Sequence, residues 1–416
     1  NRPVFLVPMS FTDISGGVTA PLGFLAGSTY CGVKAVNKNK PDIALIFSEH
    51  KTVAAATFTT NKVKAAPVRF CQQVLAVSAD TIRGIVGNSG NANACTAAQG
   101  DADAVAMAKL AAVAVGAPSD TFLVCSTGRI GELLPMAKVA EGIKVSASRL
   151  SRDAAEGVRS ANAILTSDTR PKSVTARFVW EGKTVTIAGI AKGAGMIEPN
   201  MATMLAFVCT DAAASPAELK TALKSASDQS FNCVSVDGDM STNDTVLLLA
   251  SGVSGVSVGA ASAPSGLRTL FQEALDKVCF ALAEKIVGDG EKITKVVSVE
   301  IEGARTRADA EKIARAIGNS LLVKSSWYGE DPNWGRLADA AGYARTGLEE
   351  AKLDIYYDDI PAVLGGKPLP ENKPQWKQVV KAARFAVRLK LNLGDAKFRL
   401  LAADLTDGYV NYNKSE

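Results

Sequence analysis

Short apolar runs separated by polar or glycine-containing segments recur along the whole chain. The runs 43–47, 53–58 and 204–209 are short and rich in strand-forming residues, which is typical of β-strands. The segments 101–115 and 267–287 are alanine-rich or amphipathic at helical spacing and end at glycine, which indicates helices. We therefore predict an α/β protein in which strands and helices alternate.

Three β-hairpins are predicted where a short turn sequence separates two apolar strands. The turns are 48–51, Glu181-Gly182 and Gly394-Asp395. The first turn contains His50, which we interpret as a solvated surface residue, with a catalytic role as the alternative. The second hairpin leads directly into a glycine-rich segment that begins at Lys192.

Other local patterns predict where elements begin. The sequence Ser-Pro-Ala-Glu at 215–218 predicts a helix start, because serine caps the first turn, proline suits the first helical position and glutamate completes a capping box. The run 121–124 predicts a strand that delivers 125–128 into a turn. The run 321–325 predicts a further strand.

Composition sets broad limits on the protein. A chain of 416 residues with 47% apolar and 21% charged residues is typical of a globular protein with one very large domain or two domains. We expect a smaller C-terminal α/β lobe from roughly residue 340. The 46 basic and 42 acidic residues are balanced and scattered, which argues against nucleic acid or a membrane surface as a partner.

The seven cysteines lie far apart and form no CxxC pair, so we interpret them as buried thiols in a reducing compartment. With one histidine and no clustered thiols, we predict no zinc site; carboxylates could bind a hard cation, but no pattern points to one, so we assign no metal. The compartment would be a bacterial cytoplasm or, in a eukaryote, the chloroplast stroma or mitochondrial matrix. Because the sequence begins at Asn1, we expect a segment upstream, such as a transit peptide.

A threonine stands where the loop KGAGMIEPNMATM (192–204) enters an apolar strand. A hydroxyl needs a base to become a nucleophile, and the chain has a single histidine. The base would therefore be His50, a lysine, a carboxylate or a backbone amine. One known solution is a threonine whose own α-amino group is the base, which requires a cut before it. A cut between Ala202 and Thr203 would give an α chain, 1–202, and a β chain, 203–416.

Three further motifs keep two interpretations each. The glycine and asparagine loop 88–93 can present N–H groups to an anion or form a tight strand-to-helix turn. Thr127-Gly128 has the chemistry of an oxyanion hole, or it is a turn. Asp237 and Asp239 fit a metal or acid–base site, or a turn that binds its own backbone.

The chain resembles the bifunctional glutamate N-acetyltransferase and ornithine acetyltransferase family of arginine biosynthesis in seven segments, in order along the chain. They are GNSGNANACTAAQG (87–100), CSTGRIGELLPM (125–136), ILTSDTRPK (164–172), KGAGMIEPNMATM (192–204), SVDGDMSTNDT (235–245), GDGEKITK (288–295) and YGEDPNWGR (328–336). The resemblance implies an αββα sandwich of two stacked β-sheets flanked by helices, of the ornithine acetyltransferase and DmpA type. The sandwich would be shared by both chains.

The resemblance also assigns site residues. Thr203 would be the nucleophile, Thr127 and Gly128 the oxyanion hole, and Ala202-Thr203 the cleavage site. The positions expected to contact substrate are Thr166, Lys192, Thr203, Glu291 and Asn413. In this scheme Lys192 neutralises a carboxylate or helps to lower the pKa of the Thr203 amino group, and Glu291 meets the δ-ammonium group of ornithine. The family pattern continues past the position of Asn413 to a terminal Ser or Thr, whereas this sequence ends at Glu416.

The expected reaction moves acetyl from N2-acetyl-L-ornithine to L-glutamate, without a bound cofactor. Acetyl-CoA is an open second donor, and the expected assembly is an (αβ)2 heterotetramer. A hydrolase of the same nucleophile type, an aminopeptidase or amidohydrolase, is the alternative. A third hypothesis is a nucleotide-binding module that uses the glycine loops and remains one uncut chain.

Overall fold

The computed structural model describes residues 10–12, 16–34, 40–198, 204–259 and 263–415. The chain divides into two compact units. The first unit is drawn from Asn1–Gly193, Asn200–Asn232 and Met240–Ile286, and the second from Ala194–Pro199, Cys233–Asp239 and Val287–Glu416. The predicted cleavage residues Ala202 and Thr203 lie outside the described residues.

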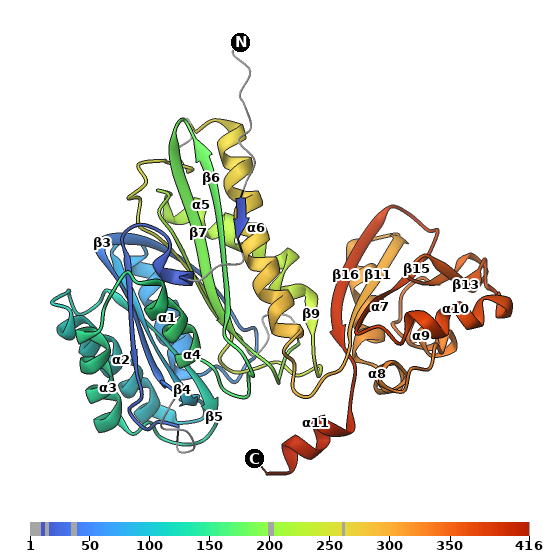
Figure 1. Cartoon of the computed structure of the whole chain (residues 1–416), viewed down its shortest axis with the longest axis horizontal. Helices are drawn as coiled ribbons and strands as arrows, with labels where there is room; N and C mark the ends of the chain where they lie inside the picture. Colours follow the sequence, from blue (N-terminus) through green and yellow to red (C-terminus); the bar gives the residue numbers. More distant parts are fainter. Residues whose placement is uncertain (1–9, 13–15, 35–39, 199–203, 260–262, 416) are drawn as a thin grey trace. The chain divides into compact units, whose positions relative to one another are not determined.

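The first unit holds one continuous sheet whose two halves form two layers, with helices on the outer sides (Figure 1). Its strands are β1 (Ser10–Thr12), β2 (Phe24–Thr29), β3 (Ile43–Phe58), β4 (Ile82–Asn91), β5 (Phe122–Arg129), β6 (Lys172–Trp180), β7 (Lys183–Lys192), β8 (Leu205–Thr210) and β10 (Thr245–Ala250). Its helices are α1 (Ala66–Ser78), α2 (Ala97–Ala114), α3 (Met136–Ser148), α4 (Ala154–Ala163), α5 (Pro216–Gln229) and α6 (Ser265–Val287).

The long strand β3 joins two halves of this sheet. Its first part pairs with β2 and β4, and its second part pairs with β10. The strand order of the sheet is β1-β6-β7-β8-β10-β3-β4-β5, and β2 pairs with β3 outside this path. The two halves face each other, because the Phe207 ring of β8 lies 3.5 Å from where a Cβ on Gly87 of β4 would stand. Apolar residues of both halves share one buried core.

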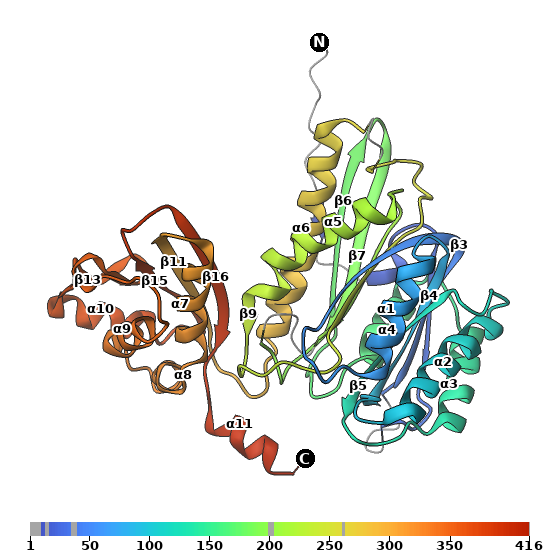
Figure 2. The same cartoon turned by 180° about the vertical axis from the view of Figure 1, so that it is seen from behind.

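Helices cover the outer faces of these two layers, as Figures 1 and 2 both show. Helices α2 and α3 bury Met107 and Ile143 against Val86 and Phe122 of β4 and β5. On the other layer, Leu282 of α6 reaches Gly189 of β7. The predicted αββα sandwich is confirmed, and strands from both sides of residue 203 belong to it.

The second unit has its own sheet, in the order β14-β13-β12-β15-β11-β16-β9. Its strands are β9 (Val234–Ser235), β11 (Val296–Ala304), β12 (Asp354–Tyr357), β13 (Ile360–Leu364), β14 (Lys367–Pro368), β15 (Arg384–Lys390) and β16 (Ala396–Ala403). Its helices are α7 (Arg307–Asn319), α8 (Leu321–Tyr328), α9 (Trp334–Gly342), α10 (Lys373–Val379) and α11 (Asp407–Tyr412). This unit takes up the chain from Val287, which is earlier than the predicted residue 340.

Two local predictions are confirmed in detail. Residues Trp180 and Lys183 pair across Glu181-Gly182, whose φ angles of 48° and 77° fit the left-handed turn of a two-residue hairpin. Helix α5 begins with the predicted capping box, in which the Ser215 hydroxyl accepts from the Glu218 N–H.

Four predictions are wrong. Residues 48–51 do not turn back, because β3 continues through them with a register shift between Phe47 and Thr52. Residues 125–128 extend β5 rather than forming a turn. Residues 321–325 are helical, since the Ser320 hydroxyl caps α8 by accepting from Val323. Strands β15 and β16 do not form a hairpin, because β11 lies between them and buries its apolar face there.

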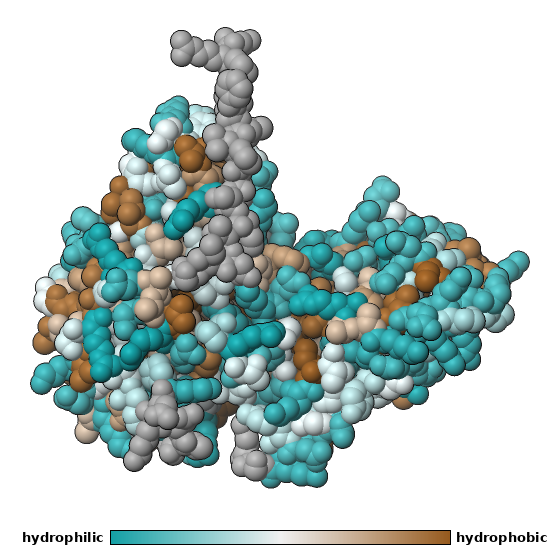
Figure 3. Space-filling model, in the orientation of Figure 1, coloured by the Kyte–Doolittle hydropathy of each residue, from teal (hydrophilic) through white to brown (hydrophobic). Residues whose placement is uncertain are grey.

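The surface of the molecule is mixed. On the face shown in Figure 3, hydrophobic residues are scattered among hydrophilic ones, which is ordinary for a globular surface. Within the described ranges, no helix combines the length and apolar character needed to cross a bilayer. All seven cysteines are free; five are buried, but Cys31 is half-buried and Cys95 is exposed, so the prediction of buried thiols holds for five.

Candidate active site

Thr127 and Gly128 lie near the end of the edge strand β5, beside β4. The Thr127 side chain is buried, whereas Gly128 is exposed and has a φ of +134°. A Cβ on Gly128 would stand 2.3 Å from the carbonyl carbon of Gly90, so only glycine fits this close approach of two strands. A threonine hydroxyl and a glycine therefore stand next to each other at this point, and these are residue types that an oxyanion hole can use.

The buried pair Asn243 and Asp244 connects this strand with the start of β8. The Asn243 amide donates to the Ser126 carbonyl at 2.9 Å, and the Asp244 carboxylate accepts from the Met204 N–H at 3.0 Å. Ser126 precedes Thr127, and Met204 follows Thr203. Consecutive residues of one loop therefore bind the neighbours of the predicted oxyanion hole and of the predicted nucleophile.

Asp168 organises the predicted substrate residues Thr166 and Lys192. Its buried carboxylate accepts from the Thr166 N–H at 3.0 Å and from the N–H of Gly193, next to Lys192, at 2.7 Å. The Lys172 ammonium donates to it at 2.6 Å. Burial alone would raise the pKa of Asp168, but the charges of Lys192 and Lys172 and the Gly193 N–H outweigh it and lower the pKa to about 2.

Lysines dominate the charge around Asp168. Lys172 and Lys192 are both about 2% exposed or less, and Lys34 interacts electrostatically with Asp168 and Lys192. Burial lowers the pKa of Lys34 to about 8, with Asp42 opposing the shift. The two buried lysines Lys172 and Lys192 thus place positive charge beside Asp168, which suits an incoming carboxylate ligand better than a cationic one.

Glu291 and Asn413 meet within the second unit. The Asn413 amide donates to the Glu291 carboxylate at 3.3 Å and to the Tyr409 carbonyl at 2.9 Å. Asn413 is exposed and Glu291 is half-buried. Glu291 also donates its backbone N–H to the carbonyl of Ala194 at 3.0 Å. This pair offers a carboxylate oxygen that an ammonium group can reach.

Sequence reasoning missed several residues of this arrangement. Asp168, Lys172 and Asp244 lie inside segments that carried the family resemblance, yet no role was predicted for them. The four-residue spacing of Asp168 and Lys172 was the available signal, since a carboxylate and an ammonium group at that spacing can pair. Asn243 had no such signal, because the carbonyls that it binds, those of Ala92 and Ser126, are remote in sequence. Lys34 had none either, because Asp168 and Lys192 lie far from it along the chain.

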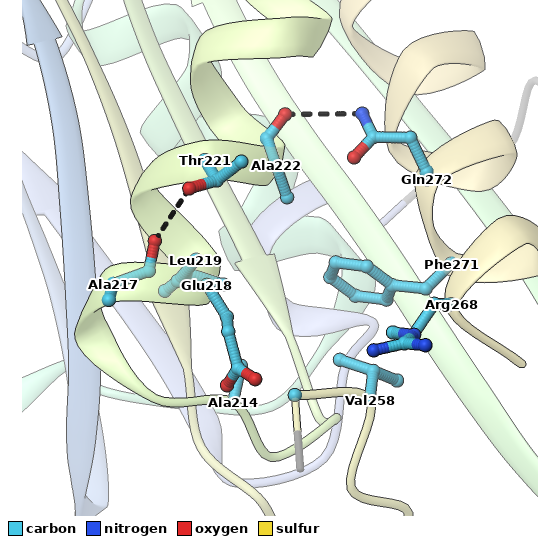
Figure 4. Close-up of a pocket in the computed structure, with 11 residues that line it drawn as sticks. Ala214, Ala217, Glu218, Leu219, Thr221, Ala222, Val258, Arg268, Phe271 and Gln272 are labelled. Atoms are coloured by element: carbon cyan, nitrogen blue, oxygen red, sulfur yellow. Dashed lines mark hydrogen bonds between the residues drawn. The ribbon is translucent and has the colours of Figure 1, made fainter. Parts of the chain in front are cut away.

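A separate cavity of about 310 Å³ lies between α5 and α6 and contains none of the predicted site residues. Figure 4 shows Phe271 and Arg268 of α6 facing Glu218 and Leu219 of α5, with Val258 beside them. The Gln272 amide donates to the Ala222 carbonyl at 3.1 Å and so ties the two helices together.

Comparison with known proteins places the chain. The ArgJ family model matches residues 25–415. The chain is 42% identical over 405 residues to the arginine biosynthesis bifunctional protein ArgJ of Symbiobacterium thermophilum, covering 97% of this chain and 98% of that protein. It is 40% identical over 398 residues to the glutamate N-acetyltransferase of Methanopyrus kandleri, covering 95% and 98% of the two.

Among solved structures, ornithine acetyltransferase from Mycobacterium tuberculosis, in complex with ornithine, is 37% identical to this chain. The match covers 46% of this chain and 98% of that chain, with a TM-score of 0.42. The relatives that match almost the whole chain are named as a bifunctional protein of arginine biosynthesis and a glutamate N-acetyltransferase, so the class of this protein is acyltransferase. The chain belongs to the ArgJ family, and it is an enzyme of arginine biosynthesis.

Proposed function

We propose that this chain moves an acetyl group from N2-acetyl-L-ornithine to L-glutamate through an ester on Thr203, after it has cut itself before that residue. The products are L-ornithine and N-acetyl-L-glutamate. The observation that carries the proposal is the Asn243–Asp244 pair, which binds the neighbours of Thr127 and Thr203. Membership of the ArgJ family supports the reaction class.

Self-cleavage begins when the Thr203 hydroxyl attacks the carbonyl carbon of Ala202. The acyl group moves from the Thr203 nitrogen to its oxygen, the nitrogen takes up a proton, and water then hydrolyses the ester. The cut leaves a carboxylate on Ala202 and a free α-amino group on Thr203. That amino group is the base of the mature enzyme, which agrees with His50 being exposed on the surface.

Transfer then takes two steps. The Thr203 oxygen attacks the acetyl carbon of acetylornithine while its amino group takes the hydroxyl proton and passes it to the leaving nitrogen of ornithine. Glutamate then attacks the ester through its α-amino group, which releases N-acetylglutamate and restores the Thr203 hydroxyl. Thr127 and Gly128 donate to the oxyanion formed in both steps. We expect ping-pong kinetics.

Substrate selection follows from the charges. Lys192 binds the α-carboxylate shared by both substrates, with Thr166 beside it as a hydrogen-bond donor or acceptor. Glu291 binds the δ-ammonium group of ornithine, and Asn413 orients Glu291 through their hydrogen bond.

Replacement of the nucleophile tests the proposal. We expect Thr203→Ala to remain a single uncut chain and to lose acetyl transfer by roughly 10⁴-fold or more, because both reactions need the hydroxyl. Thr203→Ser is the matched control, since it keeps a hydroxyl and should still cut. Intact mass and an acetylornithine assay supply the readouts. An active, uncut wild-type chain would disprove the proposal.

The hydrolase alternative differs in its acceptor. A transferase consumes acetylornithine at full rate only when glutamate is present, whereas a hydrolase does so with water alone. Measuring ornithine release with and without glutamate separates the two. Replacing acetylornithine with acetyl-CoA in the same assay tests whether acetyl-CoA is a second donor.

For the mature protein we propose an (αβ)2 heterotetramer in a reducing compartment. The shared sandwich supports stable association of the two chains, because strands before and after residue 203 pair within one sheet. The free cysteines support a reducing compartment. Native mass spectrometry of the mature protein should give twice the mass of one αβ pair.

A further inference from the structure

Two carboxylates of the loop 236–244 bind backbone N–H groups on the two sides of the proposed cleavage bond. Within the second unit, Asp237 accepts from the N–H groups of Met196 at 2.6 Å and Ile197 at 2.7 Å. Within the first unit, Asp244 accepts from the Met204 N–H at 3.0 Å. The loop passes from one unit to the other between Asp239 and Met240.

The upstream contact is a tight attachment. Ile197 is fully buried, and its carbonyl accepts from the Val236 N–H at 2.8 Å, so the backbone of this residue is bound from both sides. Next to it, Glu198 forms a mostly buried ion pair with Arg315 at 3.2 Å. Burial raises the pKa of Glu198, although Arg315 opposes that shift.

Met196 shows that this attachment imposes a conformation. Its φ of 57° lies in the left-handed region, which a residue with a side chain adopts at an energetic cost. The Asp237 carboxylate accepts from the N–H of this same residue and of the next one. Two charge-assisted hydrogen bonds therefore hold a turn that the isolated chain would not favour.

The downstream contact is equally specific. Asp244 is fully buried, and the neighbouring Asn243 amide holds the carbonyls of Ala92 at 2.6 Å and Ser126 at 2.9 Å. The Met204 N–H, which follows the proposed nucleophile, is therefore bound by Asp244. The strand that carries Thr127 is bound by the adjacent residue Asn243. Attack of a hydroxyl on the preceding carbonyl requires the reacting atoms to be held in one geometry.

We propose that Asp237 and Asp244 are positioning residues for self-cleavage, which fix the chain on the two sides of the Ala202–Thr203 bond. The inference rests on the proposed function and assigns the acidic loop a role in it. It also replaces the metal or acid–base interpretation of Asp237, whose carboxylate already accepts from Met196, Ile197, Asp239 and the Tyr409 hydroxyl.

The test follows the uncut chain over time after a short pulse of synthesis, by denaturing gel and intact mass. We expect Asp237→Ala to slow cleavage by about ten- to a hundred-fold, the effect of losing hydrogen bonds to a charged group. Asp237→Asn keeps one acceptor oxygen and should restore much of the rate. The matched control is Asp239→Ala, an exposed acid in the same loop, which should cut at the wild-type rate.

Asp244→Ala tests the downstream side because it removes the oxygen that accepts from the Met204 N–H, and it should also slow cleavage, whereas Asp244→Asn keeps that acceptor and should restore much of the rate. To compare folding on uncut chains, each substitution is combined with Thr203→Ala and its melting temperature is measured. Slow cleavage well below the melting temperature, with rescue by Asp237→Asn, supports positioning. Cleavage of Asp237→Ala and Asp244→Ala at the wild-type rate overturns the inference.

Two further outcomes are distinguishable. If Asp239→Ala is as slow as Asp237→Ala, or if Asp237→Asn gives no rescue, the effect is a general loss of loop structure and the positioning role is wrong. If the wild-type chain itself stays uncut, or Thr203→Ala is cut, the proposed function fails before the inference is tested.

Discussion

The environment of Asp168 in the first unit and the Glu291–Asn413 pair in the second unit differ in how firmly they hold the predicted substrate residues. Asp168 is 3% exposed. Its carboxylate accepts from the Lys172 ammonium group and from the backbone N–H groups of Thr166 and Gly193. Glu291 and Asn413 share one hydrogen bond of 3.3 Å at a partly exposed position. The first arrangement is fixed by buried charge, whereas the second can adjust to a ligand.

This difference shows that burial, more than residue type, decides what a charged pair contributes. A buried ion pair becomes costly when one partner is removed, because the other charge is left in a medium of low polarity. An exposed pair is replaced by water at little cost. We therefore expect substitutions around Asp168 to affect stability, and substitutions at Asn413 to affect mainly substrate binding.

The largest effect on stability is expected for Lys172→Met. The substitution removes the ammonium group that donates to Asp168 at 2.6 Å, so the buried carboxylate loses an ion-pair partner. We expect the free energy of unfolding in urea to fall by about 3 kcal/mol. The matched control is Lys224→Met, which breaks the exposed Lys224–Asp228 pair at the same four-residue spacing and should cost less than about 1 kcal/mol. Equal losses would contradict the comparison.

The next effect is on how the free energy of unfolding depends on pH. Asp168 and Asp244, both buried, should contribute slopes of opposite sign. The pKa of Asp168 falls from 3.8 to about 2 on folding, so its contribution of about 2 kcal/mol is complete above pH 3.8 and is lost as pH falls through 2. Burial raises the pKa of Asp244 well above its ordinary value, although the Met204 N–H opposes the shift. The ionised form of Asp244 is therefore disfavoured, and its contribution decreases as pH rises above 3.8.

Urea unfolding of Asp168→Asn and Asp244→Asn between pH 2 and 7 measures both slopes. The advantage of wild type over Asp168→Asn should grow from pH 2 to 4 and then level off. Its advantage over Asp244→Asn should shrink as pH rises. Slopes of the same sign would show that the lysines around Asp168 do not determine the difference.

A smaller effect is expected in the second unit. Asn413→Ala removes one hydrogen bond to Glu291 from an exposed position, so KM for acetylornithine should rise by about three- to ten-fold with little loss of stability. Steady-state kinetics at fixed glutamate, together with a melting curve, provide the check. A stability loss as large as that of Lys172→Met would mean that this pair, too, is structural.

The smallest effect is expected for His50→Ala. The imidazole lies on the exposed part of β3, and surface substitutions typically change stability by no more than about 0.5 kcal/mol. Self-cleavage and kcat should stay within about two-fold of wild type, since we assign the base to the amino group of Thr203. A large loss of either activity would point to histidine as the base.

Local sequence signals determined several features of this protein. The capping box at Ser215, the turn at Glu181-Gly182 and the long helix α6 depend on neighbours within a few residues, so the sequence alone was enough to predict them. The family resemblance supplied the fold class. It also supplied the residues Thr127, Gly128, Thr166 and Lys192, which the structure places in the first unit.

Only the tertiary structure decided the remaining features, because they depend on residues far apart in the chain. Residues 48–51 continue β3 instead of turning back, because β4 pairs with the part before them and β10 pairs with the part after them. The insertion of β11 between β15 and β16 was decided by burial of its apolar face. The burial of Asp168 and Asp244 follows from long-range packing, and the low polarity created by that packing is what makes their hydrogen bonds matter.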